Sequence, residues 1–418
     1  MLMRFMDVHG FAGGFSLGTV QAGWELAGKC ESVKMNGFGI HQMEANRRIL
    51  GDNWESQNSA PDDWKPIDDI KLLISNPPCS GFSVLSNQKF RGVDSAVNQC
   101  MWDVVNLAVK VKPEIFILES VQSAFKIGLS LMRDLRAALE DGTGQKYHLT
   151  HVLQDNYSLG GCSKRPRYFM VCSRMPFGAE PPALDRLPVV GDAIGDLVSQ
   201  PWQVQRGVVY ADAPTWWSRQ LRSPHGVVDG HWTPASESAD RLIDLIESWD
   251  EGMSEAGALE KYFARHGDLP VSWHESKRQD GRSRAQWVFD QQFSLGMFQG
   301  KRWRWDIPAY VVTGAGPMIG LHPRLPRFFT HREIARIMGF PDDWVTYPIT
   351  DLKTLGPGWG KGVSVHAGRW IAHWARESLL GNPGQYDQKN VTDLLAREGD
   401  DLDEKVIDVT KHWKTVAA

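Results

Sequence analysis

Asn76-Pro77-Pro78-Cys79-Ser80-Gly81-Phe82-Ser83 directly follows the apolar run Leu72-Leu73-Ile74. An apolar run bounded by turn residues predicts a buried strand, and the prolines with Gly81 predict the turn after it. The thiol of Cys79 is then expected at the carboxyl edge of a sheet, where open α/β folds place their ligands. A single cysteine in such a segment is more often inert and buried, so the surrounding motifs must decide its role.

Strand-like and helix-like segments alternate along much of the chain, which predicts a parallel, doubly wound α/β sheet. The segment 167–171 is expected to be a further strand, in one interpretation part of a hairpin. The expected strands are 3–8, 24–30, 72–74, 114–118 and 167–171. One helix is expected to begin near residue 16, and three more are expected over residues 102–111, 332–338 and 366–380.

The pattern of alternating strand-like and helix-like segments changes at about residue 176. Alternation weakens there, and nine of the chain's 18 tryptophans lie between Trp202 and Trp305. We expect a first α/β domain over residues 1–175, a smaller inserted domain over 176–325 and a return to the α/β domain over 326–380. Residues 381–418 are expected to form a charged, peripheral C-terminal extension.

Charge is distributed unevenly along a chain whose formal net charge is −4. Residues 271–330 carry nine Lys and Arg against four Asp and Glu, whereas residues 240–268 carry three against eight. The basic stretch indicates either ordinary solvated faces or a surface for a polyanion. The five cysteines have neither a CxxC pair nor histidines at zinc spacing, so no disulfide framework and no metal site are expected. Without a signal peptide or a membrane-spanning run, we expect a cytoplasmic protein.

A glycine-rich turn, Asp7-Val8-His9-Gly10-Phe11-Ala12-Gly13-Gly14-Phe15, stands between an expected strand and an expected helix. Such a turn lets a cofactor approach the backbone beside a helix N-terminus. Glu31 ends the second strand, where a carboxylate can accept hydrogen bonds from a ribose diol. Considered alone, the glycine-rich turn is a common feature, and Glu31 can be an exposed residue at a strand end. Together the two features favour an adenosyl-type cofactor.

Three further charged residues stand at expected strand ends. Glu119 ends an apolar strand, and it is either turned to water or partly buried with a raised pKa that suits donation to a ring nitrogen. Arg165 and Arg167 lead into the next strand at alternate positions, so their side chains share one face. They form either a surface pair or a clamp for a base carbonyl and a phosphate.

In order and spacing, these motifs resemble those of the DNA cytosine-C5 methyltransferases. That family carries DxFxGxGG, an acidic strand end, PPCxGFS, ENV, QxRxR, a variable target-recognition domain, RExARxxxFPD and GN(S/A)V. The resemblance extends over residues 3–375, and the chain is identified as a member of the family. The corresponding segments are residues 7–15, 31, 77–79, 119–121, 163–167, 192–197, 304–308, 332–336, 340–343 and 360–363.

The resemblance implies a covalent mechanism on a base flipped out of duplex DNA. The thiolate of Cys79 would add to C6 of cytosine, which makes C5 nucleophilic. Glu119 would hydrogen-bond or protonate N3 and contact the exocyclic amine. Arg165 would hold the O2 side of the base, and Arg167 would support Glu119 or Cys79. The implied setting is restriction-modification in a bacterial cell or a phage-infected host.

The resemblance also implies S-adenosyl-L-methionine as the donor, but the chain departs from the family on the donor side. His9 and Phe11 replace an aromatic Phe and a close-approach Gly, Ser120 and Ser163 replace Asn and Gln, and Lys361 replaces an Asn. A lysine near the transferred carbon suits an anionic donor, such as a carboxylated adenosylmethionine, or more remotely a folate-borne unit. If Lys361 turns outward, the donor is ordinary S-adenosylmethionine. The expected cofactor-binding residues are Asp7, His9, Gly10, Phe11, Ala12, Gly13, Gly14, Phe15, Glu31, Pro78 and Lys361.

Double-stranded DNA is the expected partner of a monomer that does not bind membranes. The expected DNA-binding residues are Ser83, Lys89 and Arg91 in the loop 80–98, with Lys277, Arg278, Lys301 and Arg302 in the inserted domain. Three alternatives remain: transfer of a larger one-carbon group, a catalytically silent DNA-binding protein and a tRNA-directed enzyme. Intact Cys79 and Glu119 disfavour the silent protein, and the long tryptophan-rich insert disfavours the tRNA-directed enzyme.

Overall fold

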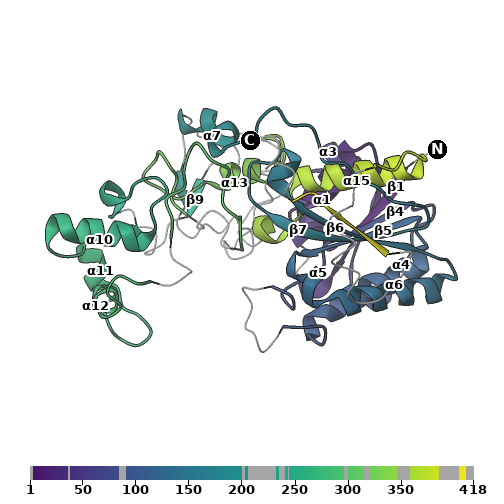
Figure 1. The fold of residues 1–418 in the computed structure, drawn as a ribbon, viewed down its shortest axis with the longest axis horizontal. Coiled ribbons are helices and arrows are strands. Elements are labelled where there is room, and N and C mark those ends of the chain that lie inside the picture. Colours follow the sequence, from purple (N-terminus) through teal and green to yellow (C-terminus); the bar gives the residue numbers. More distant parts are fainter. Residues whose placement is uncertain are drawn as a thin grey trace. The chain divides into compact units, whose positions relative to one another are not determined.

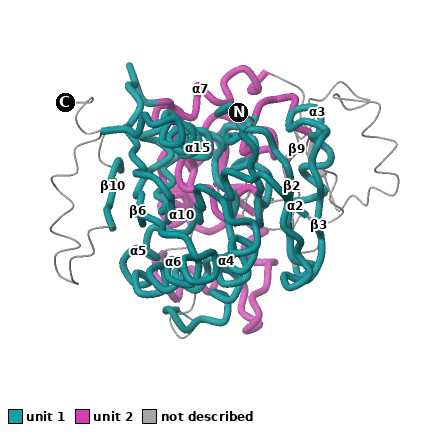
Figure 2. The backbone as a smooth tube through the Cα atoms, turned by 90° about the vertical axis from the view of Figure 1, so that its right-hand side faces the viewer, with its two compact units in different colours: residues 1–187, 338–340, 361–418 teal, residues 188–337, 341–360 magenta. Residues whose placement is uncertain are grey.

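The structure is a computed structural model that describes residues 3–35, 38–83, 91–199, 203–205, 232–234, 241–242, 244–295, 300–314, 320–345, 358–385 and 404–410. The chain divides into two compact units (Figure 2). Unit 1 comprises residues 1–187, 338–340 and 361–418, and unit 2 comprises residues 188–337 and 341–360.

Unit 1 is built on an eight-stranded sheet with the strand order β10-β6-β7-β5-β4-β1-β2-β3. The strands are β1 (Arg4–Val8), β2 (Glu25–Ser32), β3 (Glu55–Ser59), β4 (Leu72–Ser75), β5 (Ile115–Val121), β6 (His148–Asp155), β7 (Pro166–Ser173) and β10 (Glu404–Asp408). The sheet is not wholly parallel, because β7 is antiparallel to both β5 and β6. Only the short turn Asn156–Leu159 and a few more residues join β6 to β7, which is too little chain for a crossover helix.

Helices cover both faces of the sheet, which confirms the doubly wound α/β class. On one face α1 (Gly14–Gln21) packs against α15 (Val365–Leu379), and on the other α4 (Gln99–Val111) packs against α6 (Leu129–Thr143) (Figure 1). The shorter helices are α2 (Phe38–Glu44), α3 (Arg47–Leu50) and α5 (Ser123–Ile127). Helix α1 begins two residues earlier than expected, directly after Gly13, whose φ of 87° suits glycine.

The C-terminal segment contains β10, which pairs in parallel with β6 at the edge of the sheet. The expectation of a merely peripheral extension over 381–418 is therefore wrong for residues 404–408. The Glu404 side chain is 2% exposed and contacts His151 Nε2 (2.6 Å) and Arg133 Nε (2.9 Å). The other ring nitrogen of His151 contacts the Tyr168 hydroxyl at 2.6 Å. These contacts join the strand to the core of unit 1.

In its described residues, unit 2 has little regular sheet and a core that contains several tryptophans. Two three-residue strands, β8 (Gln203–Gln205) and β9 (Trp232–Pro234), pair in parallel. The helices are α7 (Val190–Ile194), α10 (Glu255–His266), α11 (Val271–Glu275), α12 (Arg284–Asp290) and α13 (His331–Ile337). Trp249 and Trp273 are buried among apolar side chains such as Leu259 and Val288.

Helix α13 falls in the segment 326–380 that the sequence assigned to the returning α/β domain, yet it packs within unit 2. Its Arg336 pairs with Asp196 (2.5 Å) and with Asp342 (2.5 Å), both of unit 2. The returning segment is thus divided between the two units, with α15 in unit 1. Among the residues that the structure describes, no helix combines the length and apolarity needed to cross a bilayer.

Replacing Glu404 with Leu should lower the free energy of unfolding by about 1–3 kcal/mol, because buried polar groups of His151 and Tyr168 lose their network. Burial alone would raise the pKa of Glu404, but the hydrogen bond from His151 and the charge of Arg133 outweigh it and hold that pKa low. The stabilisation is thus present above the unfolded-state pKa and is lost as pH falls, so urea titrations at neutral and acidic pH should show a shrinking difference.

The matched control is Lys405→Met, whose side chain points to the opposite face of the same strand. It should leave the free energy of unfolding nearly unchanged. Equal stability of Glu404→Leu and the unmodified protein at neutral pH would show that the network does not hold β10 in place.

Candidate active site

Cys79 lies in the turn after β4, four residues beyond the strand's last residue, Ser75. Backbone hydrogen bonds from Phe82 N to Cys79 O (3.0 Å) and from Ser83 N to Ser80 O (3.2 Å) close the turn. Because β4 is parallel to its neighbours β1 and β5, the carboxyl ends of the three strands meet at one edge. The thiol therefore stands at the edge where the sequence places it.

Glu119 lies in β5, and its side chain is 1% exposed. Its Oε1 pairs with Arg167 Nε at 3.0 Å, and its Oε2 accepts a hydrogen bond from Asn76 Nδ2 at 2.6 Å. Burial raises the pKa of Glu119, and the charges of Arg167 and Arg165 oppose that rise. A carboxyl group with a raised pKa keeps its proton more readily, as a donor to a ring nitrogen must.

The Cys79 thiol is affected by the same charges. Burial and the carboxylate of Glu119 raise the pKa of Cys79, whereas Arg167 and Arg165 lower it. The balance favours the thiol over the thiolate at neutral pH, so the nucleophile has to be generated when a substrate binds.

Arg165 is buried and belongs to the same cluster. Its Nη2 donates to Gly362 O at 2.7 Å, and its backbone N donates to Asp155 Oδ1 at 2.6 Å. Burial lowers the pKa of Arg165 to about 9, which leaves the guanidinium charged at neutral pH. Its charge acts on both Glu119 and Cys79. The four expected catalytic residues thus form one electrostatic cluster, while their catalytic roles stay predictions.

Asn76 is a site residue that sequence reasoning misses. Its side chain is buried, and its amide contacts the carboxylate of Glu119. The available signal is a polar residue that directly follows the buried strand β4 and stands one step before the Pro-Pro-Cys turn.

On the donor side, the carboxylate of Asp7 is bonded within the protein. Its Oδ2 accepts a hydrogen bond from Ser16 Oγ (2.5 Å) and pairs with Lys29 Nζ at 3.4 Å, with both charged side chains fully buried. Gly10 covers the pair so closely that a Cβ there would lie 2.2 Å from Asp7 Oδ2. Asp7 therefore shapes the turn, and Gly10 is needed for the close approach.

His9 and Phe11, two departures from the family pattern, both have left-handed backbones, with φ of 62° and 46°. Such values are uncommon outside glycine. Both side chains are buried, and the His9 ring meets Trp64 edge-on at 5.4 Å between centroids. Burial and the charge of Lys29 lower the pKa of His9 to about 3, so its ring is neutral.

Glu31 lies at the end of β2, as expected, but one of its oxygens already has partners. Its Oε2 accepts hydrogen bonds from Gly39 N (2.9 Å) and Ile40 N (3.2 Å) at the start of α2. Burial raises the pKa of Glu31. A ribose diol would therefore meet a carboxylate that is anchored to α2 rather than one that is free to turn.

The segment 361–363 connects the donor turn to the base side. Gly362 O accepts the hydrogen bond from Arg165, and Val363 O lies so close to Gly14 that a Cβ there would come within 2.2 Å of it. Lys361, directly before these two residues, is exposed. Among the other expected donor residues, Ala12 and Phe15 are core residues, and the Phe15 ring packs against Phe169.

The donor-side residues fit a polar ligand. His9 Nδ1, His9 Nε2 and Asp7 Oδ1 are buried without a hydrogen-bond partner among the described residues. Buried polar atoms ordinarily have partners, so unpaired ones beside a glycine-rich turn are groups that a ligand or water would satisfy. In the described ranges, no cluster of His, Cys, Asp and Glu has the composition of a metal site.

Of the expected DNA-binding residues, Lys89 lies outside the described residues, and Ser83 and Arg91 flank that gap. In unit 2, Lys277 is exposed. Arg278 stacks over the Trp287 ring at 4.2 Å, and Lys301 lies over the Tyr310 ring at 4.3 Å. Cation–π stacking holds a basic side chain in place without neutralising its charge.

Arg302, another expected DNA-binding residue, donates hydrogen bonds to backbone carbonyls within unit 2. Its Nη1 donates to Trp249 O at 2.6 Å, and its Nε donates to Pro323 O at 3.1 Å. Burial lowers the pKa of Arg302. These bonds give Arg302 a structural role in unit 2, while its expected DNA-binding role stays a prediction.

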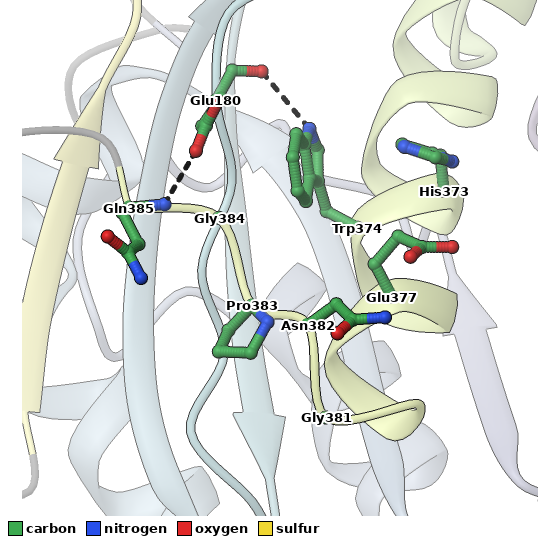
Figure 3. A pocket seen from close by; sticks show the side chains of 9 residues that line it. All are labelled: Glu180, His373, Trp374, Glu377, Gly381, Asn382, Pro383, Gly384 and Gln385. Carbon is green, nitrogen blue, oxygen red and sulfur yellow. Dashed lines mark hydrogen bonds between the residues drawn. The ribbon is translucent and has the colours of Figure 1, made fainter.

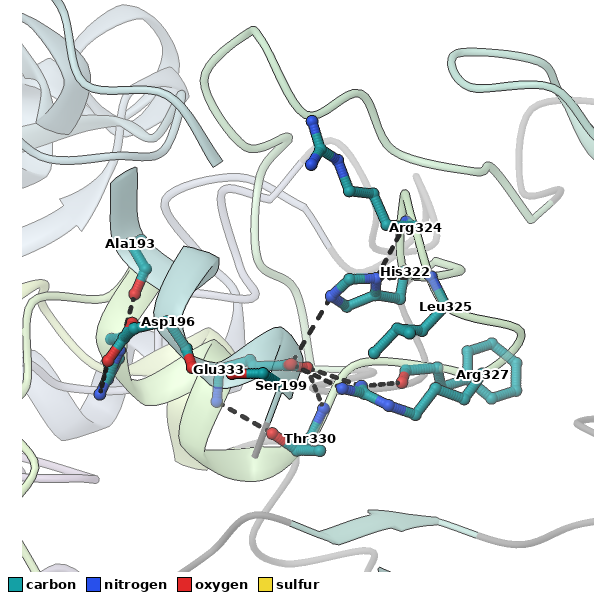
Figure 4. A network of polar contacts seen from close by, with 11 residues as sticks. Ala193, Asp196, Ser199, His322, Arg324, Leu325, Arg327, Thr330 and Glu333 are labelled. Carbon is teal, nitrogen blue, oxygen red and sulfur yellow. Dashed lines mark hydrogen bonds and ion pairs between the residues drawn. The ribbon is translucent and has the colours of Figure 1, made fainter. Parts of the chain in front are cut away.

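A buried ion-pair network stabilises unit 2 around Glu333 (Figure 4). Arg327 binds both carboxylate oxygens of Glu333, at 2.8 and 2.7 Å. Thr330 N donates to the same carboxylate at 2.8 Å, and His322 Nε2 lies 3.6 Å from it. The family motif around Arg332 and Glu333 thus serves the architecture of unit 2.

A hollow of about 640 Å³ lies at the end of α15 in unit 1 (Figure 3). It is lined by Glu180, His373, Trp374, Glu377 and residues 381–385. Two of the lining residues donate hydrogen bonds to Glu180. Trp374 Nε1 donates to the backbone O of Glu180 (3.1 Å), and Gln385 N donates to its Oε1 (2.8 Å). None of the expected site residues lines this hollow.

The chain is similar to type II methyltransferases at low identity. M.DdeI of Desulfomicrobium norvegicum, a type II methyltransferase, is 24% identical over 358 residues, which cover 82% of this chain and 80% of that protein. M.XorII of Xanthomonas oryzae pv. oryzae, also a type II methyltransferase, is 26% identical over 213 residues. That match covers 46% of each chain, about half of the relative's length.

Solved structures share the fold. A prophage-encoded E. coli protein described as a DNA modification methyltransferase superposes with a TM-score of 0.61 at 16% identity, covering 90% of this chain and 99% of that one. The Entamoeba histolytica methyltransferase EhMeth gives a TM-score of 0.52 at 12% identity, covering 91% and 99%. The family model for C-5 cytosine-specific DNA methylases matches residues 3–373. Since that match spans almost the whole sequence, the chain belongs to the C-5 cytosine-specific DNA methylase family.

Proposed function

We propose that this protein transfers a methyl group to C5 of cytosine within a specific sequence of duplex DNA, through a covalent adduct on Cys79. The observation that supports it most is the cluster of Cys79, Glu119, Arg165 and Arg167 where β4 and β5 end and β7 begins. A nucleophile, a proton donor and two cations in one buried place are the groups that activation of a cytosine requires.

The first step attaches the base to the protein. With the base out of the duplex, the Cys79 thiol releases its proton to solvent, and the sulfur forms a bond to C6. Glu119 passes its proton to N3 as charge moves into the ring, and the ring becomes an enamine that is nucleophilic at C5. The cations of Arg165 and Arg167 stabilise the carboxylate that remains.

The second step releases the base. C5 forms a bond to the electrophilic one-carbon group that a bound donor would supply, and the electron pair of the broken bond stays with the departing donor. The C5 proton then leaves to a base or water, the bond between sulfur and C6 breaks, and Glu119 recovers the N3 proton. Aromaticity is restored, and Cys79 leaves C6 as a thiolate that takes a proton from solvent to become the thiol again.

S-adenosylmethionine, the donor that the family generally uses, is the donor that we propose. The chain's own residues would hold it through the turn 9–14, Glu31 and the segment 361–363. Because that segment contacts both Arg165 and Gly14, Lys361 stands at the boundary between base and donor. A carboxylated adenosylmethionine, which would pair its anionic group with Lys361, is the second candidate donor.

We propose that unit 2 reads the DNA sequence. The whole protein would act as a monomer within a bacterial or phage-infected cell. Lys277 is exposed, Lys301 lies over the Tyr310 ring, and Arg278 lies over Trp287 and pairs with Asp280 at 3.7 Å; we propose the two lysines as the first contacts to phosphates and base edges.

DNA that carries 5-fluorocytosine should trap the protein covalently, because fluorine cannot leave C5 as a proton does. Cys79→Ala should abolish the adduct and turnover while DNA binding stays measurable. Cys100→Ser, which changes a thiol outside the cluster, should be trapped as efficiently as the unmodified protein. Denaturing electrophoresis reads out the adduct. Equal trapping of Cys79→Ala would assign the nucleophile elsewhere, and no trapping of any variant would favour the catalytically silent DNA-binding protein.

Lys277→Gln combined with Lys301→Gln should weaken DNA binding and reduce the slope of log K against log salt by about 2, if each lysine neutralises one phosphate. Fluorescence anisotropy at several salt concentrations measures the slope. Lys112→Gln with Lys146→Gln removes the same charge from unit 1 and serves as the control. A slope identical to that of the unmodified protein would place the DNA path elsewhere.

Lys361→Asn should keep or raise transfer from S-adenosylmethionine and reduce any transfer from its carboxylated analogue. A unit charge about 4 Å from an anionic group contributes on the order of 1 kcal/mol in water and more where water is excluded. Competition between the two donors, read by mass spectrometry of nucleosides, gives the preference. Lys361→Arg keeps the charge and should keep the preference; an unchanged preference in Lys361→Asn would make Lys361 a bystander.

A further inference from the structure

The amide of Asn76 is held in a fixed place beside Glu119. Its side chain is 1% exposed, and its Nδ2 lies 2.6 Å from Glu119 Oε2. Its backbone N donates to Val8 O at 3.0 Å, which extends the pairing of β4 with β1 by one residue. Two neighbouring strands therefore fix the backbone from which this amide projects.

The two oxygens of Glu119 have chemically different partners. Oε1 faces Arg167, a cation that can only donate, and Oε2 faces Asn76, whose amide carries both donors and an acceptor. The acceptor, Asn76 Oδ1, is buried and has no hydrogen-bond partner among the described residues. A half-turn of the amide would bring Oδ1 to Glu119 Oε2.

We infer that Asn76 is a positioning residue for Glu119 in the proposed transfer reaction, on which this inference rests. Nδ2 donates to Oε2 while Glu119 is a carboxylate, and after the half-turn Oδ1 accepts the O–H while Glu119 is a carboxylic acid. Arg167 can still donate to Oε1 of the acid form, but it cannot accept the new O–H, because a guanidinium has no acceptor. Asn76 therefore keeps the carboxyl oriented through both protonation states that the reaction requires.

The pH dependence of Glu119 is set by groups on several elements. Arg167 on β7 and Arg165 in the preceding loop favour the carboxylate form of Glu119. Cys79, after β4, disfavours that form when its own thiol is ionised, because the two negative charges repel. Asn76 bonds both forms, but its bond to the ionised carboxylate is charge-assisted and the stronger of the two, so Asn76 favours the carboxylate. Removing that donor should therefore raise the pKa of Glu119, and an Asp at position 76 should raise it further by adding a like charge.

The test follows the protonation of Glu119 directly. Difference infrared titration of the full-length chain in a Cys79→Ser background removes the coupled thiol, and Glu119→Gln identifies the carboxyl band. Asn76→Asp, which preserves the shape of Asn, should move the midpoint of that band to higher pH, and Asn76→Ser should move it less. Ser75→Ala, which removes a hydroxyl without a hydrogen-bond partner among the described residues, should leave the midpoint in place.

In the Cys79-containing protein, the same Asn76 variants should slow formation of the 5-fluorocytosine adduct by about tenfold to a hundredfold, the scale of one hydrogen bond to a charged group. DNA affinity and the thermal midpoint of Asn76→Ser should stay close to those of the unmodified protein.

The outcomes separate this inference from the proposed function. An unchanged Glu119 midpoint in Asn76→Asp and Asn76→Ser, with the unmodified protein still trapped by 5-fluorocytosine, would overturn the role of Asn76 alone. Loss of trapping in the unmodified protein would overturn the transfer reaction, whatever the titration shows.

Discussion

The buried carboxyl group of Glu119 is the constraint on which the site depends. A charge removed from water costs several kcal/mol unless cations and donors replace the solvent. Here the replacements come from separate parts of unit 1: Asn76 after β4, Arg167 on β7 and Arg165 before it. The antiparallel course of β7 is what brings the start of that strand, with its arginines, to the edge where the parallel strands β4 and β5 end.

The parts of this arrangement that are local in sequence could be predicted. Apolar runs followed by turn residues place Cys79 and Glu119 at strand ends, and alternation places Arg165 and Arg167 on one face. The contact between Asn76 and Glu119 could not be predicted, because it depends on the register of β4 against β5 rather than on any pattern near Asn76. The hydrogen bonds of Arg302 could not be predicted either, since the sequence around a basic residue does not show whether it will meet water or backbone carbonyls.

The donor side follows a different logic from the base side. Asp7 and Glu31 stand where the family resemblance places them, yet Asp7 is paired with Lys29, and Glu31 is anchored by the backbone of α2. His9 and Phe11 are accommodated in left-handed backbone conformations that most side chains avoid. Some buried polar atoms on the donor side are thus hydrogen-bonded by the protein itself. The His9 nitrogens and Asp7 Oδ1 have no hydrogen-bond partner among the described residues.

The segment 361–363 makes these two sides interdependent. Gly362 O fixes Arg165 on the base side, and one residue later Val363 O fits against Gly14 with no room for a Cβ. A side chain added at Gly14 would displace Val363 and, through Gly362, the guanidinium beside Glu119 and Cys79. Substitutions in the donor turn are therefore compatible with the base-side cluster only if the backbone of residues 361–363 keeps its position. His9 and Phe11 depart from the family pattern with both side chains buried, while Gly14 keeps the space that Val363 O occupies.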